Sequence, residues 1–259
     1  MKIVVCVKQV PDTAATMTVE DGKISWGDAQ LIINPWDEYA VEAALNIAAD
    51  HGAEVIILSM GKEDETEAIK HALAMGANDA VLVTDSAMDG ADNVAIAKVL
   101  AKAIQKIGDV DLALFGQQSV DTVTGLLPLQ VARVLGWPAL PLVSHFDAIS
   151  PDEGTLRVKR ALEEGKQIVD GKFPAVVSLT KDYGEPRYPS FMGIRKASRA
   201  KYPIWGLEDL EMEAPKSAVS WSDVSEPPKR EIVSEIITGE TPAEKAQNLV
   251  KKIMEEKVL

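Results

Sequence analysis

The first half of the chain alternates short, strongly apolar runs with longer segments of helical periodicity. The apolar runs, rich in Val, Ile and Leu, predict strands over residues 3–7, 54–60, 80–84 and 111–115. Each run is followed by a segment with an apolar residue at every third or fourth position, which predicts helices over 34–52, 64–76, 91–107 and 124–135. Strands that are apolar on both faces and are joined by helices form parallel sheets. The expected fold class is therefore α/β, with a mostly parallel sheet covered by helices on both faces.

One of these helices has a clear start signal. Asn34 is a suitable capping residue and Pro35 suits the first turn. Asp37 and Glu38 follow directly, where carboxylates interact favourably with the helix dipole. We interpret them as a solvated first turn, because adjacent helical residues do not face each other as an acid–base pair would.

The pattern changes after Pro138. Shorter runs predict an antiparallel addition to the sheet, with strands over 142–149, 155–161, 166–169 and 175–179. Residues 181–230 contain six of the 14 prolines and no long periodic stretch, which is typical of an arm. A capping box at 241–244 then starts a terminal helix with an apolar stripe, which must be buried against another surface. We divide the chain into an α/β domain (1–180), a loop (181–205) and a C-terminal arm ending in a helix (206–259).

Composition excludes several classes of protein. The net charge of −13 is wrong for a nucleic-acid binder, which needs a basic surface. Cys6 is the single cysteine and the three histidines are far apart in the sequence, so neither a disulfide nor a metal site is expected. We interpret Cys6 as a small apolar residue of a buried strand. No apolar run approaches about 18 residues and no targeting segment is recognisable, so we expect a cytoplasmic protein that does not insert into membranes.

The charge is unevenly distributed. Residues 181–205 hold six basic and two acidic residues, whereas residues 1–180 carry a net charge of −12 and residues 206–259 a net charge of −5. The segment 183–198 (YGEPRYPSFMGIRKAS) combines this basic island with aromatic residues, a composition typical of protein interfaces. A loop packed on its own domain is an equally good interpretation of these residues.

Four loops lie at the expected carboxyl ends of the parallel strands, where ligands bind in such sheets: 8–13, 60–64, 84–92 and 116–125. The last of them, GQQSVDTVTG, precedes a predicted helix and is rich in hydroxyl and amide groups. Free backbone N–H groups at the helix start, with the Thr124 hydroxyl, would form a phosphate cradle. Ordinary turn and cap chemistry remains the alternative. No glycine-rich dinucleotide fingerprint or P-loop occurs.

Several motifs occur together in order along the chain, and they resemble the β subunit of electron transfer flavoproteins. They are VCVKQVPD (5–12), INPWDEYAVEAA (33–44), HALAMGAND (71–79), FGQQSVD (115–121), LGWP (135–138) and EPRYPSFMGIRKA (185–197). The similarity covers essentially the whole chain. It implies a Rossmann-like, adenine-nucleotide-binding domain.

The resemblance also implies a heterodimer with a larger α subunit. In the family, the α subunit holds the redox-active FAD, and the β subunit binds AMP in a structural role or, in the electron-bifurcating branch, a second FAD. The heterodimer accepts electrons from dehydrogenases such as acyl-CoA dehydrogenases and passes them to an acceptor that is often a quinone oxidoreductase. A carrier subunit rather than a catalyst on its own is therefore expected.

The resemblance places three groups of functional residues on this sequence. The nucleotide site is formed by Cys6, Val7, Asn34, Met60, Gln118, Asp121, Thr122, Thr124, Gly125, Leu126 and Leu127, with the base near the first three. Thr13 and Trp36 match positions near the flavin of the α subunit. Recognition of the dehydrogenase maps to Tyr188, Phe191, Ile194, Arg195 and Lys196, with Phe191 as the anchoring side chain.

The nucleotide loop departs from both branches of the family. It reads DTVTGLLP over 121–128, in which Leu126 and Leu127 lack polar side chains but keep their backbone N–H groups. The upstream residues Thr84-Asp85 and Gly90-Ala91-Asp92 resemble the bifurcating branch, but Asn93 replaces the threonine that is usual there. We therefore favour AMP over a second FAD. A hypothesis of a different class is a stand-alone nucleotide-sensing module related to universal stress proteins, but the long arm argues against it.

Overall fold

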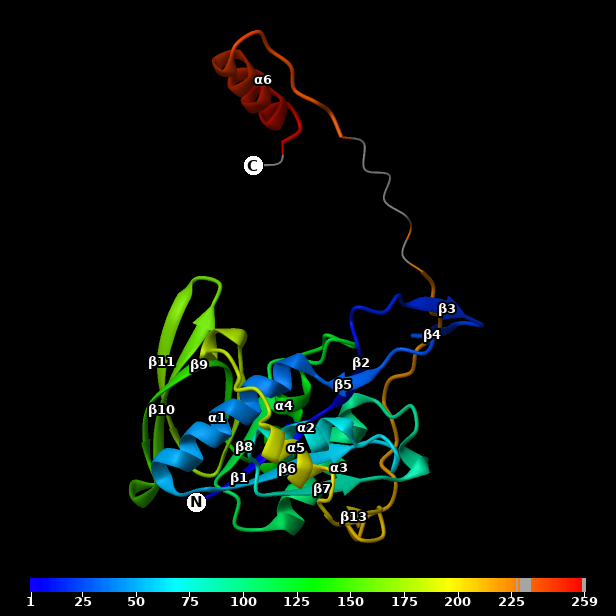
Figure 1. The fold of residues 1–259 in the computed structure, drawn as a ribbon, viewed down its shortest axis with the longest axis vertical. Helices are drawn as coiled ribbons and strands as arrows, with labels where there is room; N and C mark the ends of the chain where they lie inside the picture. The colour runs from blue at the N-terminus through cyan, green and yellow to red at the C-terminus, as the bar shows by residue number, and fades with distance from the viewer. Residues whose placement is uncertain (227, 229–233, 258–259) are drawn as a thin grey trace. The chain divides into compact units, whose positions relative to one another are not determined.

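The computed structural model describes residues 1–226, 228 and 234–257. Residues 227, 229–233 and 258–259 of the expected arm lie outside the described residues. The chain divides into two compact units, 1–224 and 225–259. The first contains a nine-stranded sheet (Figure 1) in the order β11-β10-β9-β12-β8-β1-β6-β7-β13. Its strands are β1 (Lys2–Val7), β6 (Glu54–Met60), β7 (Asp79–Val83), β8 (Leu112–Gly116), β9 (Ala139–Ser150), β10 (Thr155–Leu162), β11 (Gly165–Lys172), β12 (Ala175–Leu179) and β13 (Ile204–Trp205).

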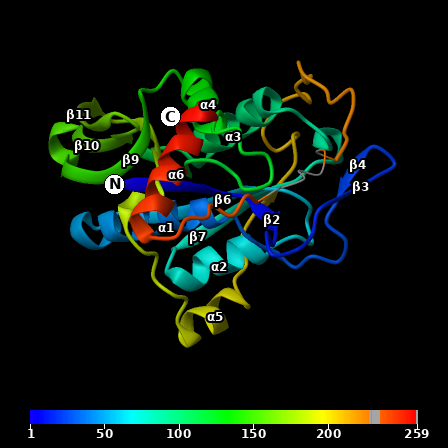
Figure 2. The same cartoon turned by 90° about the horizontal axis from the view of Figure 1, so that it is seen from above.

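Helices cover both faces of this sheet, as the sequence predicts. Figure 2 shows α1 (Pro35–His51) and α2 (Glu67–Met75) on one face, and α3 (Asn93–Ile107) and α4 (Leu127–Leu135) on the other. Alternate residues of β1 supply the two cores: Ile3 and Val5 pack with α1 and α2, whereas Val4 and Cys6 pack with α3 and α4. The α/β class and the two-sided covering are therefore confirmed.

The strand order reverses its direction next to β1. The chain passes through α1 to β6 and through α2 to β7, and α3 then returns it to β8 on the other side of β1. The segments that follow the parallel strands β1 and β8 consequently run to opposite sides of the sheet. Such a switch point leaves a crevice at the carboxyl ends of the strands, where ligands bind in open α/β sheets.

The antiparallel addition is smaller than the sequence suggested. β10 is antiparallel to both β9 and β11, but β12 is parallel to both β8 and β9. The expectation that 175–179 belongs to the antiparallel part is therefore wrong. All five residues of β12 are buried, which is the pattern of a central parallel strand that is covered on both faces.

Shorter elements complete the first unit. β2 (Gln9–Pro11) pairs with β5 (Leu31–Ile33), and β3 (Thr18–Glu20) with β4 (Lys23–Ser25). The single-turn helices are η1 (Ser86–Met88), η2 (Pro151–Glu153) and η3 (Lys181–Tyr183). Residues 181–205 also hold α5 (Phe191–Ala197), which lies on α2. The segment 181–230, which lacks a long periodic stretch, thus begins with ordered structure, because β13 extends the sheet beside β7.

The second unit contains α6 (Pro242–Glu255). Half of the predicted capping box is confirmed, because Thr241 Oγ1 accepts a hydrogen bond from Glu244 N at 3.2 Å. The Glu244 carboxylate accepts its hydrogen bond from Glu240 N, one residue before the cap, at 2.8 Å. The apolar residues Leu249, Val250 and Met254 are exposed within the described residues of this unit. None of the helices in the described parts of the chain has the length and apolar character needed to cross a bilayer.

Candidate functional site

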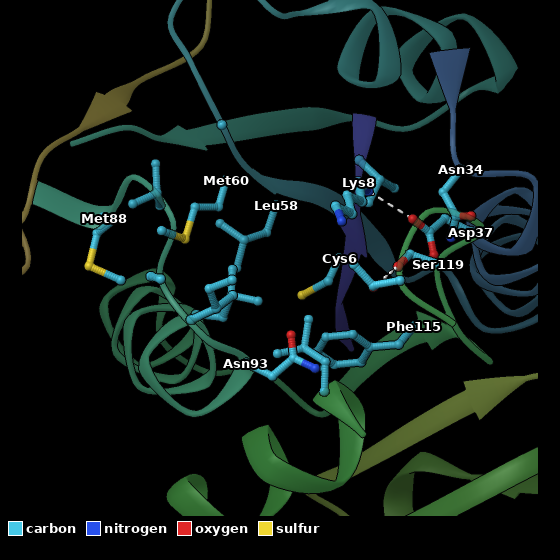
Figure 3. Close-up of a pocket in the computed structure, with 18 of the residues that line it drawn as sticks. Cys6, Lys8, Asn34, Asp37, Leu58, Met60, Met88, Asn93, Phe115 and Ser119 are labelled. Atoms are coloured by element: carbon cyan, nitrogen blue, oxygen red, sulfur yellow. Dashed lines mark hydrogen bonds between the residues drawn. The ribbon is translucent and has the colours of Figure 1, made fainter. Parts of the chain in front are cut away.

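A cavity of ≈ 460 Å³ lies at the carboxyl ends of β8, β1, β6 and β7, at the switch point of the sheet. Its apolar wall is built by residues that pair in register. Cys6 is opposite Phe115 on one side and Leu58 on the other, so the three side chains form a row on one face of the sheet (Figure 3). Burial raises the pKa of the Cys6 thiol, which therefore stays neutral and contributes only apolar surface. A row of this kind offers a surface against which a planar base can stack.

The loop after β8 forms the opposite rim, and Asn34 holds it in place. Asn34 Nδ2 donates to the Gln118 carbonyl oxygen at 2.9 Å, and Val120 N donates to Asn34 Oδ1 at 3.2 Å. The prediction that the Asn34 side chain caps α1 is wrong, because both of its polar atoms bind the loop instead. On the other side, Asn93 Nδ2 donates to Thr124 Oγ1 at 2.9 Å. The loop is therefore fixed from α1 and from α3.

Asp37 links three segments beneath this rim. It is buried, and its carboxylate accepts hydrogen bonds from Lys8 N at 2.7 Å and from Gly116 N at 3.2 Å. Burial raises the pKa of Asp37 to about 7, although its hydrogen bonds act in the opposite direction. The interpretation of Asp37 as part of a solvated first turn is therefore wrong. The Lys8 side chain continues the network to Asp121 Oδ2 at 2.5 Å.

The start of α4 supplies backbone donors. Among the described residues, the N–H groups of Thr124, Gly125 and Leu126 have no hydrogen-bond acceptor. Gly125 has a φ of 60°, and a Cβ there would lie 3.4 Å from the Gln117 carbonyl oxygen. The predicted helix start at 124 is wrong, since α4 begins at Leu127. The free donors thus belong to the loop and the first turn together, and they suit an anion.

The charges around the cavity limit how many phosphate groups a bound ligand can carry. Its lining contains Lys8 and Lys62 as cations against five carboxylates, which are those of Asp37, Glu63, Glu65, Asp85 and Asp89. A triphosphate would be repelled by this excess of negative charge, whereas one or two phosphate groups can be held by backbone donors. Within the described part of the chain, no cluster of three or more His, Cys, Asp or Glu side chains is arranged to hold a metal ion.

The structure brings most of the predicted nucleotide residues together. Nine of the eleven line the cavity: Cys6, Val7, Asn34, Met60, Gln118, Thr122, Thr124, Gly125 and Leu127. Asp121 lies behind the rim, paired with Lys8, and Leu126 is exposed at the start of α4. Thr13 is exposed and Trp36 is half-buried, and neither lines the cavity.

Sequence reasoning missed several lining residues. Asp37 and Phe115 could have been found from their places at a helix start and a strand end that face the switch point. Met88 belongs to the loop 84–92, which the sequence marks only as one of four loops at the strand ends, and Asn93 is the first residue of α3. Their side chains carry no motif, so no local signal marks them.

A second predicted group lies on α5 and just before it. Tyr188, Phe191 and Met192 are 95%, 75% and 71% exposed, and Ile194 is also exposed. Arg195 and Lys196 are exposed beside them. The interpretation of this segment as packed on its own domain therefore fails for its apolar side chains, which form a patch beside the basic residues.

Comparison with known proteins identifies the family. The model of the electron transfer flavoprotein domain matches residues 24–210. The chain belongs to the electron transfer flavoprotein β-subunit family. It is 34% identical to the caffeyl-CoA reductase-Etf complex subunit CarD of Acetobacterium woodii over 100% of both chains. It is 36% identical to an electron transfer flavoprotein subunit beta of Thermoanaerobacterium thermosaccharolyticum over 98% of both chains, and 36% identical to that of Clostridium acetobutylicum over 82% and 81%.

Five of the six sequence motifs of this electron transfer flavoprotein chain gather at two places in the fold. The motifs at 5–12, 33–44 and 115–121 meet at the cavity, through β1, the start of α1 and the loop after β8. The motifs at 71–79 and 185–197 meet where α5 packs on the end of α2. Most of the motifs therefore lie at one cleft and at one exposed helix.

Proposed function

We propose that this chain is the β subunit of a heterodimeric electron transfer flavoprotein and binds AMP in the cavity between β1 and β8. The observation that carries the proposal is the cavity itself, with a row of apolar side chains on one wall and free backbone donors on the other. The base packs near Cys6 and Val7, and the phosphate lies at residues 124–127.

The flavin chemistry is supplied by a partner. In this proposal, an α subunit holds the FAD that carries electrons, close to Thr13 and Trp36, and the C-terminal arm and α6 pack on that subunit. The exposed apolar stripe of α6 supports this, because such a stripe must be buried in the assembled protein. The heterodimer passes electrons from a dehydrogenase to a quinone oxidoreductase, and it works in the cytoplasm.

A second FAD in the β subunit is the alternative ligand. The cavity continues past Met60 to residues 84–91, and the four strands it crosses extend over about 14 Å. This leaves room beyond a base and a ribose. The similarity to the CarD subunit, which is named as part of an Etf complex, also favours this alternative.

The nucleotide can be identified directly. We expect the heterodimer, coexpressed with its α subunit and extracted with acid, to release AMP and FAD in equal amounts. Two FAD molecules per heterodimer and no AMP would replace the AMP proposal by the second-FAD alternative. The double substitution Thr124→Ala and Gly125→Pro should lower the nucleotide content, since it removes one backbone donor and the positive φ. Unchanged content would place the phosphate elsewhere.

We further propose that the exposed patch on α5 docks the dehydrogenase, with Phe191 inserted into an apolar pocket of that partner. Phe191→Ala should raise the KM of an acyl-CoA dehydrogenase for the heterodimer by about tenfold or more, because an anchoring aromatic side chain is lost. The measurement is steady-state reduction of the heterodimer at varied concentration. The association of the subunits and the nucleotide content serve as controls, and an unchanged KM with every dehydrogenase tested would remove the docking assignment.

A further inference from the structure

The exposed side chains of α5 cannot fix the helix themselves, because they contact solvent rather than the protein. The helix has only seven residues, and Ala197 is its buried residue. An isolated helix of this length is unstable in water, so its position must come from contacts on either side. Those contacts are made by the segment that leads into it and by its packing on α2.

We propose that Arg187 is a positioning residue for partner docking, and that its ion pair with Glu42 holds the segment before α5 so that Phe191 and Met192 are in place before a dehydrogenase arrives. The inference rests on the proposed docking function of α5. It assigns to a residue outside the exposed patch the task of keeping that patch in one conformation.

The contacts of Arg187 are more extensive than those of an ordinary surface ion pair. Its Nε donates to Glu42 Oε2 at 2.7 Å and its Nη2 donates to Glu42 Oε1 at 3.0 Å, which is a bidentate arrangement. Its backbone N also donates to Glu42 Oε2 at 3.0 Å. The same carboxylate therefore fixes both the side chain and the main chain of residue 187.

The ion pair is anchored to the helical framework. Glu42 is on α1 and is 8% exposed, and the guanidinium of Arg187 holds the pKa of this carboxyl below its usual value. Asn46, one turn later on α1, accepts a hydrogen bond from Arg187 Nη2 at 2.7 Å and donates to the Tyr183 hydroxyl at 3.3 Å. Tyr183 packs edge-on against Phe146 of β9. The segment 183–187 is thus held on α1 at both ends.

The helix α5 itself is fixed by close backbone packing on α2 (Figure 2). A Cβ at Gly193 would lie 2.2 Å from the Ala74 carbonyl oxygen, so only glycine permits this approach. Ser190 Oγ accepts a hydrogen bond from Gly193 N at 2.9 Å and caps the helix. Two attachments, one at Arg187 and one at Gly193, therefore bracket Phe191.

Releasing one attachment should weaken docking without removing any group that touches the partner. Ordering a single residue on binding has a cost equivalent to about a tenfold loss of affinity. We therefore expect Arg187→Gln to raise the KM of an acyl-CoA dehydrogenase for the heterodimer by about tenfold. The kcat should be unchanged, because α5 adopts the same conformation once bound.

The experiment uses the full-length heterodimer and includes a readout that needs no partner. Hydrogen exchange should become faster at Ile194 N and Ser198 N, which bond to Ser190 O and Ile194 O within α5. Arg187→Lys should be intermediate, since it keeps the charge and loses the bidentate geometry. Gly193→Ala is the second variant and should give the same exchange and KM changes by displacing α5 from α2.

Arg157→Gln is the matched control. It removes another bidentate ion pair, between Arg157 and Asp170 of the β10–β11 hairpin, at the opposite end of the sheet from α2. We expect neither the KM nor exchange in α5 to change in this variant.

The outcomes separate this inference from the docking proposal. Faster exchange in α5 with a raised KM supports the positioning role of Arg187. Unchanged hydrogen exchange in Arg187→Gln overturns the positioning role. Faster exchange in Arg187→Gln with an unchanged KM also overturns it, provided that Phe191→Ala raises the KM in the same assay. If Phe191→Ala has no effect on any dehydrogenase, the docking proposal fails and the positioning role fails with it.

Discussion

At the residue scale, the cavity at the switch point of the sheet is organised around one buried carboxylate. Asp37 is at the third position of α1 and accepts hydrogen bonds from the backbone at the ends of β1 and β8. A carboxylate is an acceptor for both N–H groups, whereas a protonated acid must also place its own O–H. The ionised form therefore holds the two strand ends together, and burial opposes that form.

The pH dependence of stability should report the titration of Asp37. Its pKa is about 7 in the folded chain and near 3.8 when unfolded, so the folded state binds more protons between these values. The free energy of unfolding should therefore fall, by a few kcal/mol in order of magnitude, as the pH rises from about 4 to about 7. Asp37→Asn should remove this component. Urea unfolding of both proteins across the pH range tests it, and parallel pH profiles would contradict the assignment.

At the element scale, the cleft depends on how closely the start of α1 approaches the end of β8. Gly116 ends β8, and a Cβ there would lie 2.4 Å from Asp37 Oδ1 and 2.6 Å from the Trp36 carbonyl carbon. The clash involves backbone, which a rotamer change cannot relieve. The close approach of the start of α1 to the end of β8 is therefore possible only with glycine at this position.

Gly116→Ala should consequently destabilise the chain by about 3 kcal/mol or more, because α1 must move away from β8. It should also lower the nucleotide content, since the same movement pulls Asn34 from the loop. Gly61→Ala is a suitable control, because its Cβ would meet nothing nearer than the flexible Glu65 side chain at 3.8 Å. Urea denaturation measures the difference, and equal stability of the two variants would show that α1 and β8 are not so tightly coupled.

The central elements could be predicted because their signals are local. The strands 3–7 and 54–60 are β-branched runs, and their positions agree with β1 and β6 to within one residue. The burial of Asp37 could not be predicted in this way, because its two backbone donors are 29 and 79 residues distant in sequence. The start of α4 was missed for a different reason: Val123 and Gly125 have positive φ values, which a periodicity argument does not detect. The place of β12 depends on strand pairing, which has no local signal.

At the scale of the whole molecule, the net charge of −13 conceals a basic surface beside α5. Of the six basic residues in 181–205, Arg187 is neutralised by Glu42. Arg195, Lys196, Arg199 and Lys201 are exposed and form no ion pair within the described residues. Their field is therefore available to an approaching partner, and Arg195 and Lys196 share α5 with Phe191. The acidic remainder repels other acidic surfaces.

This arrangement predicts that docking depends on ionic strength. Between about 0.05 M and about 0.3 M salt, the KM of an acyl-CoA dehydrogenase for the heterodimer should rise several-fold, because screening shortens the reach of the basic surface. Reduction within the complex should be unaffected, so the kcat should stay constant. The double substitution Arg195→Gln and Lys196→Gln should raise the KM at low salt and flatten the salt dependence. Lys98→Gln and Lys102→Gln, on α3 and outside the basic island, provide a control of equal charge change. If that control flattens the salt dependence as strongly, the attraction comes from the charge of the whole chain rather than from the surface beside α5.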